Sequence, residues 1–123
     1  GFSNNDLVQQ EKLIARIRLR GLEELNEFRN SKAYFNDWTQ SNILFSVKRF
    51  KVKNLENLQD LLDSPNESVA LLVIRLIFYF RNSAQLLAID DFEQRTGSEK
   101  LVSEINFFKR NSTTKAYSSY DRN

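Results

Sequence analysis

The 123-residue chain has a net charge of +2, with 41% hydrophobic and 28% charged residues, and it lacks cysteine, histidine and methionine. These values are typical of one globular domain and exclude disorder of the whole chain, because apolar side chains are plentiful enough to offset chain entropy. The missing residue types exclude disulfides, thiol chemistry and sites that need a histidine base or ligand. The net charge is far below that of a dedicated nucleic-acid-binding protein, so this class is excluded as well.

Helical spacing of apolar residues predicts an all-α fold, a single-domain bundle of four to five helices over residues 1–110. Three glycines and one proline supply few breakers. The first helix is predicted over residues 5–29, with Gly21 as a weak point inside it. Asn30 and Ser31 then form a predicted turn.

The second predicted helix has a split apolar pattern. One face holds Tyr34, Phe35 and Trp38, and a different face holds Ile43, Leu44, Val47 and Phe50. A single helix in a bundle rarely buries two faces, so we expect a break or kink near residues 39–42. If the later face packs inward, Tyr34, Phe35 and Trp38 remain near the surface as a candidate interface with another chain.

Three further helices are expected in the rest of the chain. A short one covers residues 54–62 and ends at the turn formed by residues 63–66. A helix over about residues 67–89 is apolar nearly all round, which predicts the centre of the bundle. The last helix follows Gly97 with Ser98 as its cap, and residues 111–123 are predicted to be a flexible tail rich in Ser, Thr and Asn.

Arg75 is a cation in the middle of the predicted central helix. A buried charge must pair with an opposite charge or bind an anion. We expect a structural ion pair with Glu24, Glu27 or Asp37, and the alternative is a bound anion or partner.

Lys48, Arg49, Lys51 and Lys53 form the densest basic segment, with Phe50 among them. Clustered cations with an aromatic residue suit a nucleic-acid or other anion patch. The alternative is a solvated helix end, where cations favour the helix dipole.

Several specific sites are excluded on chemistry. A helix-turn-helix around residues 58–72 would present apolar side chains to the groove, and residues 90–93 lack the glycine and ligand spacing of a calcium loop. Arg75 and Arg81 disfavour a membrane span by the central helix. No phosphate-binding loop or nucleophile motif occurs, so we expect no enzyme activity, no cofactor and no metal.

The function that remains is a protein–protein interaction or scaffolding module whose partner is another protein chain, including a second copy of itself. The alternative is a nucleic-acid-associated protein that uses residues 48–53. Because the sequence has no methionine, we expect that it does not begin at a natural start codon, and the alternatives are a protease-cleavage scar at Gly1 or a piece of a longer protein, so an upstream membrane anchor stays open. The expected location is the cytoplasm or the cytoplasmic face of a membrane.

Overall fold

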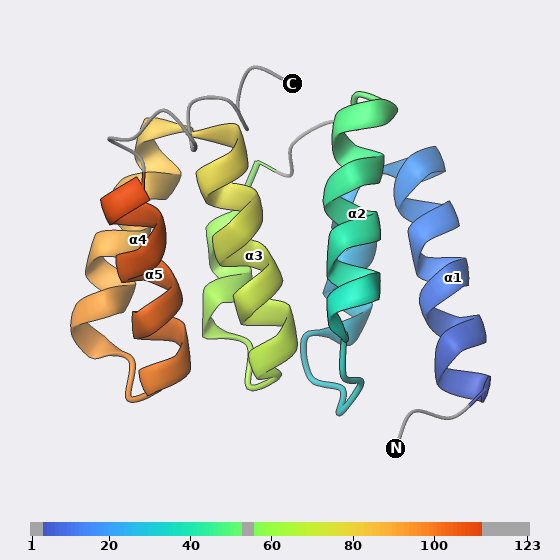
Figure 1. The fold of residues 1–123 in the computed structure, drawn as a ribbon, viewed down its shortest axis with the longest axis horizontal. Helices are drawn as coiled ribbons and strands as arrows, with labels where there is room; N and C mark the ends of the chain where they lie inside the picture. The colour runs from blue at the N-terminus through green and yellow to red at the C-terminus, as the bar shows by residue number, and fades with distance from the viewer. Residues whose placement is uncertain (1–3, 53–55, 112–123) are drawn as a thin grey trace.

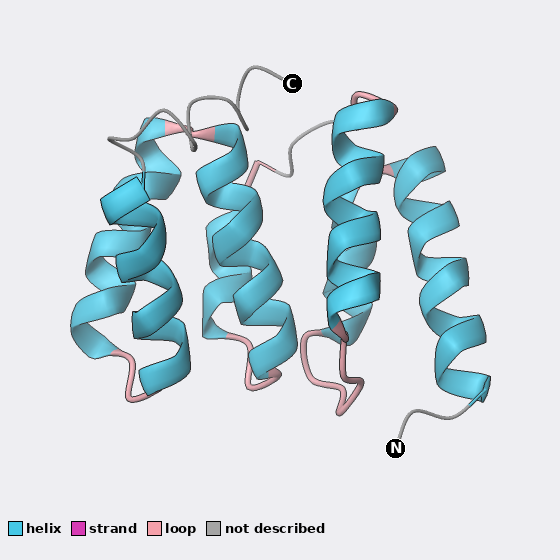
Figure 2. Cartoon of the chain, in the orientation of Figure 1, coloured by secondary structure: helices cyan, strands magenta, loops and turns pink. Residues whose placement is uncertain are grey.

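The structure, a computed structural model, describes residues 4–52 and 56–111, and its regular structure in these ranges is helical, with no strand (Figure 2). The predicted all-α class is therefore confirmed. In chain order the elements, with η for a 3₁₀-helix, are α1 (Asn4–Arg20), η1 (Leu22–Phe28), α2 (Asp37–Arg49), η2 (Leu58–Asp63), α3 (Glu67–Phe80), α4 (Ser83–Arg95) and α5 (Glu99–Asn111).

The helices form two layers (Figure 1). Helices α1, α2, α3 and α5 stand side by side and run in the same direction, while η1, η2 and α4 return behind them in the opposite direction. Each front helix except α5 is thus followed by a shorter return element, as in stacked helical hairpins. Helix α3 lies between α2 and α5 and packs on η2 and α4, so the apolar helix is central, as predicted.

The predicted first helix over residues 5–29 is wrong in its length, because it breaks at Gly21. Gly21 has a φ of +105°, a backbone conformation that side chains with a β-carbon rarely adopt. The chain reverses there and continues as η1, which buries Leu22 and Leu25 against the core. Arg16 on α1 reaches back to η1, where its Nε lies 3.4 Å from Glu24 Oε1 and its Nη2 pairs with Glu27.

The predicted central helix over residues 67–89 is also two helices. Helix α3 ends at Phe80, Arg81 takes a left-handed conformation with a φ of +58°, and Asn82 caps α4 by accepting from the Gln85 N–H at 3.2 Å. Leu72, Ile74 and Leu76 are fully buried, while Phe80 is only half-buried. The apolar run therefore predicted the core residues Leu72, Ile74 and Leu76 correctly. It did not predict that Asn82 begins a new helix.

The expected kink near residues 39–42 is wrong. Helix α2 begins only at Asp37, after Asn36 caps it by accepting from the Thr39 N–H at 2.9 Å. Tyr34 and Phe35 precede the helix, and this explains why their spacing does not fit its buried face.

Two other predictions concern the chain's later segments. Ser98 caps α5 through its hydroxyl oxygen, which accepts from the Leu101 N–H at 3.2 Å, and α5 buries Leu101 and Ile105. The short helix expected over residues 54–62 is the 3₁₀-helix η2, and residues 54 and 55 lie outside the described ranges. Asn111 ends α5, and the remaining residues of the predicted tail, 112–123, also lie outside them.

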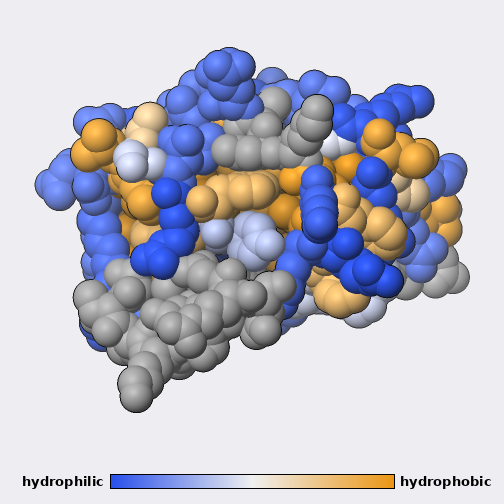
Figure 3. All heavy atoms as spheres, turned by 90° about the horizontal axis from the view of Figure 1, so that it is seen from above, coloured by the Kyte–Doolittle hydropathy of each residue, from blue (hydrophilic) through white to orange (hydrophobic). Residues whose placement is uncertain are grey.

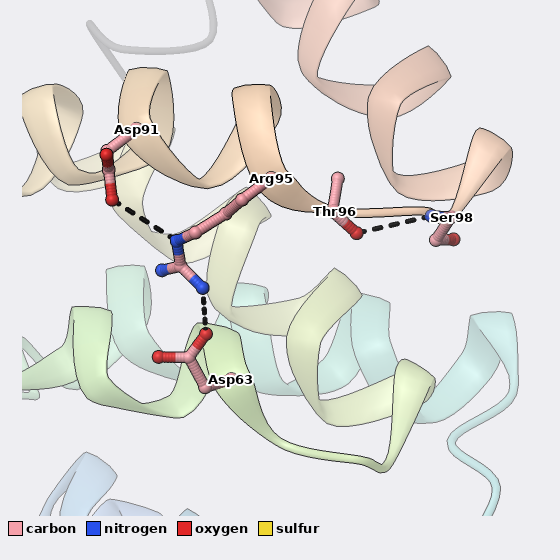
Figure 4. Close-up of polar contacts among 5 residues, drawn as sticks. All are labelled: Asp63, Asp91, Arg95, Thr96 and Ser98. Atoms are coloured by element: carbon pink, nitrogen blue, oxygen red, sulfur yellow. Dashed lines mark hydrogen bonds and ion pairs between the residues drawn. The ribbon is translucent and has the colours of Figure 1, made fainter.

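Arg95 fastens the end of α4 to the end of η2 (Figure 4). Its Nε lies 3.2 Å from Asp91 Oδ2, and its Nη1 donates to Asp63 Oδ1. Asp63 first and then Asp91 raise the pKa of Arg95 above its ordinary value, because both carboxylates accept hydrogen bonds from its charged form. This exposed contact links α4 to η2 at Asp63, the first residue of the turn formed by residues 63–66.

Candidate interaction surface

Residues 29–36 have no regular structure except a turn, yet their backbone is held by buried side-chain amides from three parts of the fold. Buried polar groups of this kind are stable only when they are hydrogen-bonded. The loop therefore has one defined path beneath the start of α2. The three amides and their acceptors are Gln10 Nε2 with the carbonyl oxygen of Tyr34 (2.9 Å), Gln40 Nε2 with that of Phe35 (3.2 Å) and Asn66 Nδ2 with that of Ala33 (2.8 Å).

Asn66 has two tasks at once. Its Oδ1 caps α3 by accepting from the Ser68 N–H at 3.0 Å, and its Nδ2 donates to the carbonyl oxygens of Ser31 (3.1 Å) and Ala33. The neighbouring Ser64 hydroxyl donates to the carbonyl oxygen of Arg29. The turn before α3 therefore clamps the loop that leads into α2.

The structure separates the three candidate interface residues. Tyr34 and Trp38 are exposed, at 60% and 47%, whereas Phe35 is only 1% exposed and packs edge-on against Phe28 with ring centroids 5.3 Å apart. Phe35 is therefore a core residue and the prediction that places it at an interface is wrong. Alternation in an extended segment sends neighbouring side chains to opposite sides, so Tyr34 points outward while Phe35 points inward.

Helix α2 presents a further exposed aromatic side chain that sequence analysis missed. Phe45 is 57% exposed and follows Trp38 by seven residues, two helical turns or about 10.5 Å along the same face. We call Trp38, Ser41, Phe45 and Lys48, all exposed, the outer face of α2. The spacing of Trp38 and Phe45 was the signal that could have found this face.

Exposed apolar residues are concentrated in the N-terminal part of the described chain. Of the eight large hydrophobic residues that are exposed in the described ranges, six lie between residues 8 and 50. Scattered exposed apolar residues are normal on a surface, but a concentration on one helical pair is unusual without a partner. The six are Val8, Leu19, Tyr34, Trp38, Phe45 and Phe50, and the other two are Leu87 and Phe107.

The predicted basic patch lies at the C-terminal end of α2. Lys48, Arg49 and Lys51 are exposed there, and Lys53 lies outside the described residues. The structure adds Arg18 from α1, whose Nε donates to the buried Ser46 hydroxyl at 2.9 Å. Nothing in the sequence indicated that Arg18 would join this patch, because the contact depends on how α1 packs beside α2. We call Arg18, Lys48, Arg49 and Lys51 the basic cluster.

Arg75 lies half-buried between the front helices. Its Nε is 2.9 Å from Glu104 Oε1 on α5, and its Nη1 donates to Gln40 Oε1 on α2. The partner is a carboxylate from another helix, but it is none of Glu24, Glu27 and Asp37. These contacts occupy the guanidinium and join α2, α3 and α5.

Open hollows on the surface include two that are lined by described residues alone. One, of about 290 Å³, is bordered by Lys32, Tyr34, Glu67 and Lys100, and the other, of about 450 Å³, by residues 96–99 and α5 as far as Arg110. Within the described ranges, no three histidine, cysteine or carboxylate side chains are grouped to hold a metal ion. In the same ranges, no helix has both the length and the hydropathy to cross a bilayer.

Comparison with protein-family models, with curated proteins and with solved structures finds no match to this chain.

Proposed function

We propose that this protein is a helical interaction module that binds another protein chain through the outer face of α2. The observation that supports the proposal is the pair Trp38 and Phe45, half-exposed and aligned on a helix whose preceding loop is held by buried amides. Large aromatic side chains on a rigid support are the residues that most often dominate protein interfaces, because they bury much area with little loss of conformational freedom. Tyr34 is also exposed, but it precedes the helix and borders the hollow with Lys32 and Lys100, so it is not counted in the outer face of α2.

The test is a double substitution with a matched control. Random peptides displayed on phage are selected against the unmodified chain, and the affinity of the enriched peptides is measured for each variant. Trp38→Ala with Phe45→Ala should weaken binding by about 30-fold, which corresponds to about 2 kcal/mol for an aromatic hot spot. Leu87→Ala with Phe107→Ala removes equally exposed apolar side chains elsewhere and should leave the affinity unchanged.

Equal affinities of both double variants for the peptides, or no enrichment of any peptide, would reject the proposal. Sedimentation of the protein alone at about 100 μM then distinguishes the kind of partner, since self-association depends on concentration. If the partner is a second copy of this chain, the dimer should be lost in the Trp38→Ala, Phe45→Ala variant only.

A further inference from the structure

The parallel front layer places the C-terminal ends of four helices at one end of the molecule. In Figure 1 helices α1, α2, α3 and α5 all end at the top, and α1, α2 and α5 each have basic residues in their last turn. Figure 3 looks down on this end and shows hydrophobic atoms lying among hydrophilic ones. At the opposite end lie the first turns of α2, α3 and α5, which contain the acidic residues Asp37, Glu67 and Glu99.

Among residues 4–52 and 56–111, carboxylates pair with some cations of this basic end but not with those of the basic cluster. Arg20 Nη1 lies 3.6 Å from Glu24 Oε1, and Lys109 Nζ lies 2.6 Å from Asp90 Oδ1 and 2.7 Å from Glu93 Oε1. Asp90 first and then Glu93 raise the pKa of Lys109 by accepting hydrogen bonds from its charged form. For the four cations of the basic cluster, no ion pair occurs within the part of the chain that the structure describes.

Phe50 makes the basic cluster apolar as well as charged. Its ring is 51% exposed, with the Arg18 guanidinium carbon 4.7 Å and the Arg49 guanidinium carbon 6.0 Å from the ring centroid. Cations stacked on an aromatic ring keep their hydrogen-bond donors directed to the side, where carboxylates can accept from them. The cluster also continues directly from the outer face of α2, because Lys48 belongs to both.

We infer that the partner is an acidic segment of protein that lies along α2, with apolar side chains on Trp38 and Phe45 and carboxylates on the basic cluster. This inference rests on the proposed function and names the chemistry of its partner. Charge complementarity supports it, since among the described residues no carboxylate pairs with the four cations at the end of this apolar stripe. A nucleic acid fits less well, because a phosphate chain that follows α2 would leave the cations at Lys48 and approach the exposed Asp37.

The experiment uses the same peptide selection and reads the composition of the enriched pool. The unmodified chain should enrich peptides that combine large apolar residues with several Asp or Glu residues. The variant Lys48→Gln, Arg49→Gln, Lys51→Gln should bind these peptides about tenfold more weakly at 50 mM salt and with a smaller difference at 300 mM, because screening weakens charge attraction. Arg18 is left unchanged in this variant because it also binds buried Ser46.

The control variant Lys12→Gln, Lys32→Gln, Lys100→Gln changes the net charge equally at exposed lysines outside the cluster and should bind like the unmodified chain. Equal weakening by both triple variants would overturn the inference, since it would show a response to net charge alone. An enriched pool without acidic residues whose binding still needs Trp38 would overturn the inference and leave the proposed function intact. Tight binding of a 30-nucleotide poly-dT strand that depends on the cluster would overturn it in favour of nucleic acid. Thermal melting by circular dichroism verifies that all variants are folded.

Discussion

Buried polar side chains replace regular secondary structure around residues 29–36. Gln10, Thr39 and Gln40 are each at most 2% exposed, and every one of them forms a side-chain hydrogen bond. The break predicted at residues 39–42 was wrong, because the two apolar faces on either side of this polar stretch were assigned to one helix, whereas Tyr34 and Phe35 precede α2. The sequence does not show that Gln40 donates to the carbonyl oxygen of Phe35 in the preceding loop and that the Thr39 hydroxyl donates to Gln10 Oε1 on α1. The position of Tyr34 and of the start of α2 depends on these contacts.

Asn66→Asp should separate the two tasks of Asn66. Aspartate caps a helix as well as asparagine does, so the start of α3 keeps its acceptor. The carboxylate cannot donate, however, and it would lie against the carbonyl oxygens of Ser31 and Ala33. We expect the free energy of unfolding to fall by about 3 kcal/mol, the cost of leaving buried acceptors unsatisfied beside a charge.

Urea unfolding measures this difference, and Asn82→Asp is the matched control. Asn82 caps α4 at an exposed position, so its substitution should change the free energy of unfolding by no more than about 0.5 kcal/mol. Equal effects of the two substitutions would mean that the amide of Asn66 contributes nothing to holding the loop.

At the scale of elements, periodicity located the helices but not their ends. The apolar run that predicts residues 67–89 as one helix continues through Arg81, where a left-handed residue ends α3. Helical spacing likewise continues through Gly21, where the chain reverses. In both places, ending the helix loses less free energy than the burial of the next segment against the core provides. That gain depends on tertiary contacts, which a sequence pattern does not contain. The cap at Ser98 was predictable because its signal is local.

The C-terminal end of α2 allows a test of one such boundary. Lys51 has a φ of +50°, and the Val52 N–H donates to the carbonyl oxygen of Val47 at 3.1 Å, which is the hydrogen bond of a Schellman motif. Glycine adopts this conformation without the steric cost of a β-carbon. Lys51→Gly should therefore raise the free energy of unfolding by about 0.5–1 kcal/mol, even though it removes a cation of the basic cluster.

Thermal and urea unfolding check this expectation against Lys48→Gly. Lys48 lies inside α2, so the same substitution should lower the free energy of unfolding by about 1 kcal/mol. A loss of stability in Lys51→Gly would show that residue 51 does not adopt the left-handed conformation in solution.

At the scale of the whole molecule, one hydrophobic core joins the α1–α2 part of the chain to the α3–α5 part. Buried residues of both parts, such as Ile43 and Leu72, belong to one continuous cluster, and the contacts of Asn66 and Arg75 add polar links between them. Composition and periodicity predicted this all-helical core. The two-layer order of the helices could not be predicted, because it depends on the reversals at Gly21 and Arg81.

The continuous core predicts cooperative unfolding. Trp38 is the only tryptophan, so its fluorescence reports on α2, while far-ultraviolet circular dichroism reports on all helices. The two signals should follow the same urea transition, as expected for two-state behaviour. An earlier transition in fluorescence would show that α2 opens before α3 and would contradict a single folding unit. In the Asn66→Asp variant, residues 29–36 lose the hydrogen bonds from the Asn66 amide. The urea midpoints measured by fluorescence and by circular dichroism should then differ.

The parallel front layer has an electrical consequence for the free molecule. Peptide dipoles within one helix point the same way, and in α1, α2, α3 and α5 they point the same way across the layer as well. The returning η1, η2 and α4 cancel only part of this sum, since two of them are single short 3₁₀ segments. The basic last turns of α1, α2 and α5 and the acidic first turns of α2, α3 and α5 oppose the peptide dipoles of this layer in direction, so each end of a front helix has side-chain charge that offsets its backbone charge. The basic cluster at the ends of α1 and α2 places four cations at this end, so an approaching anionic partner is attracted toward it before any contact forms.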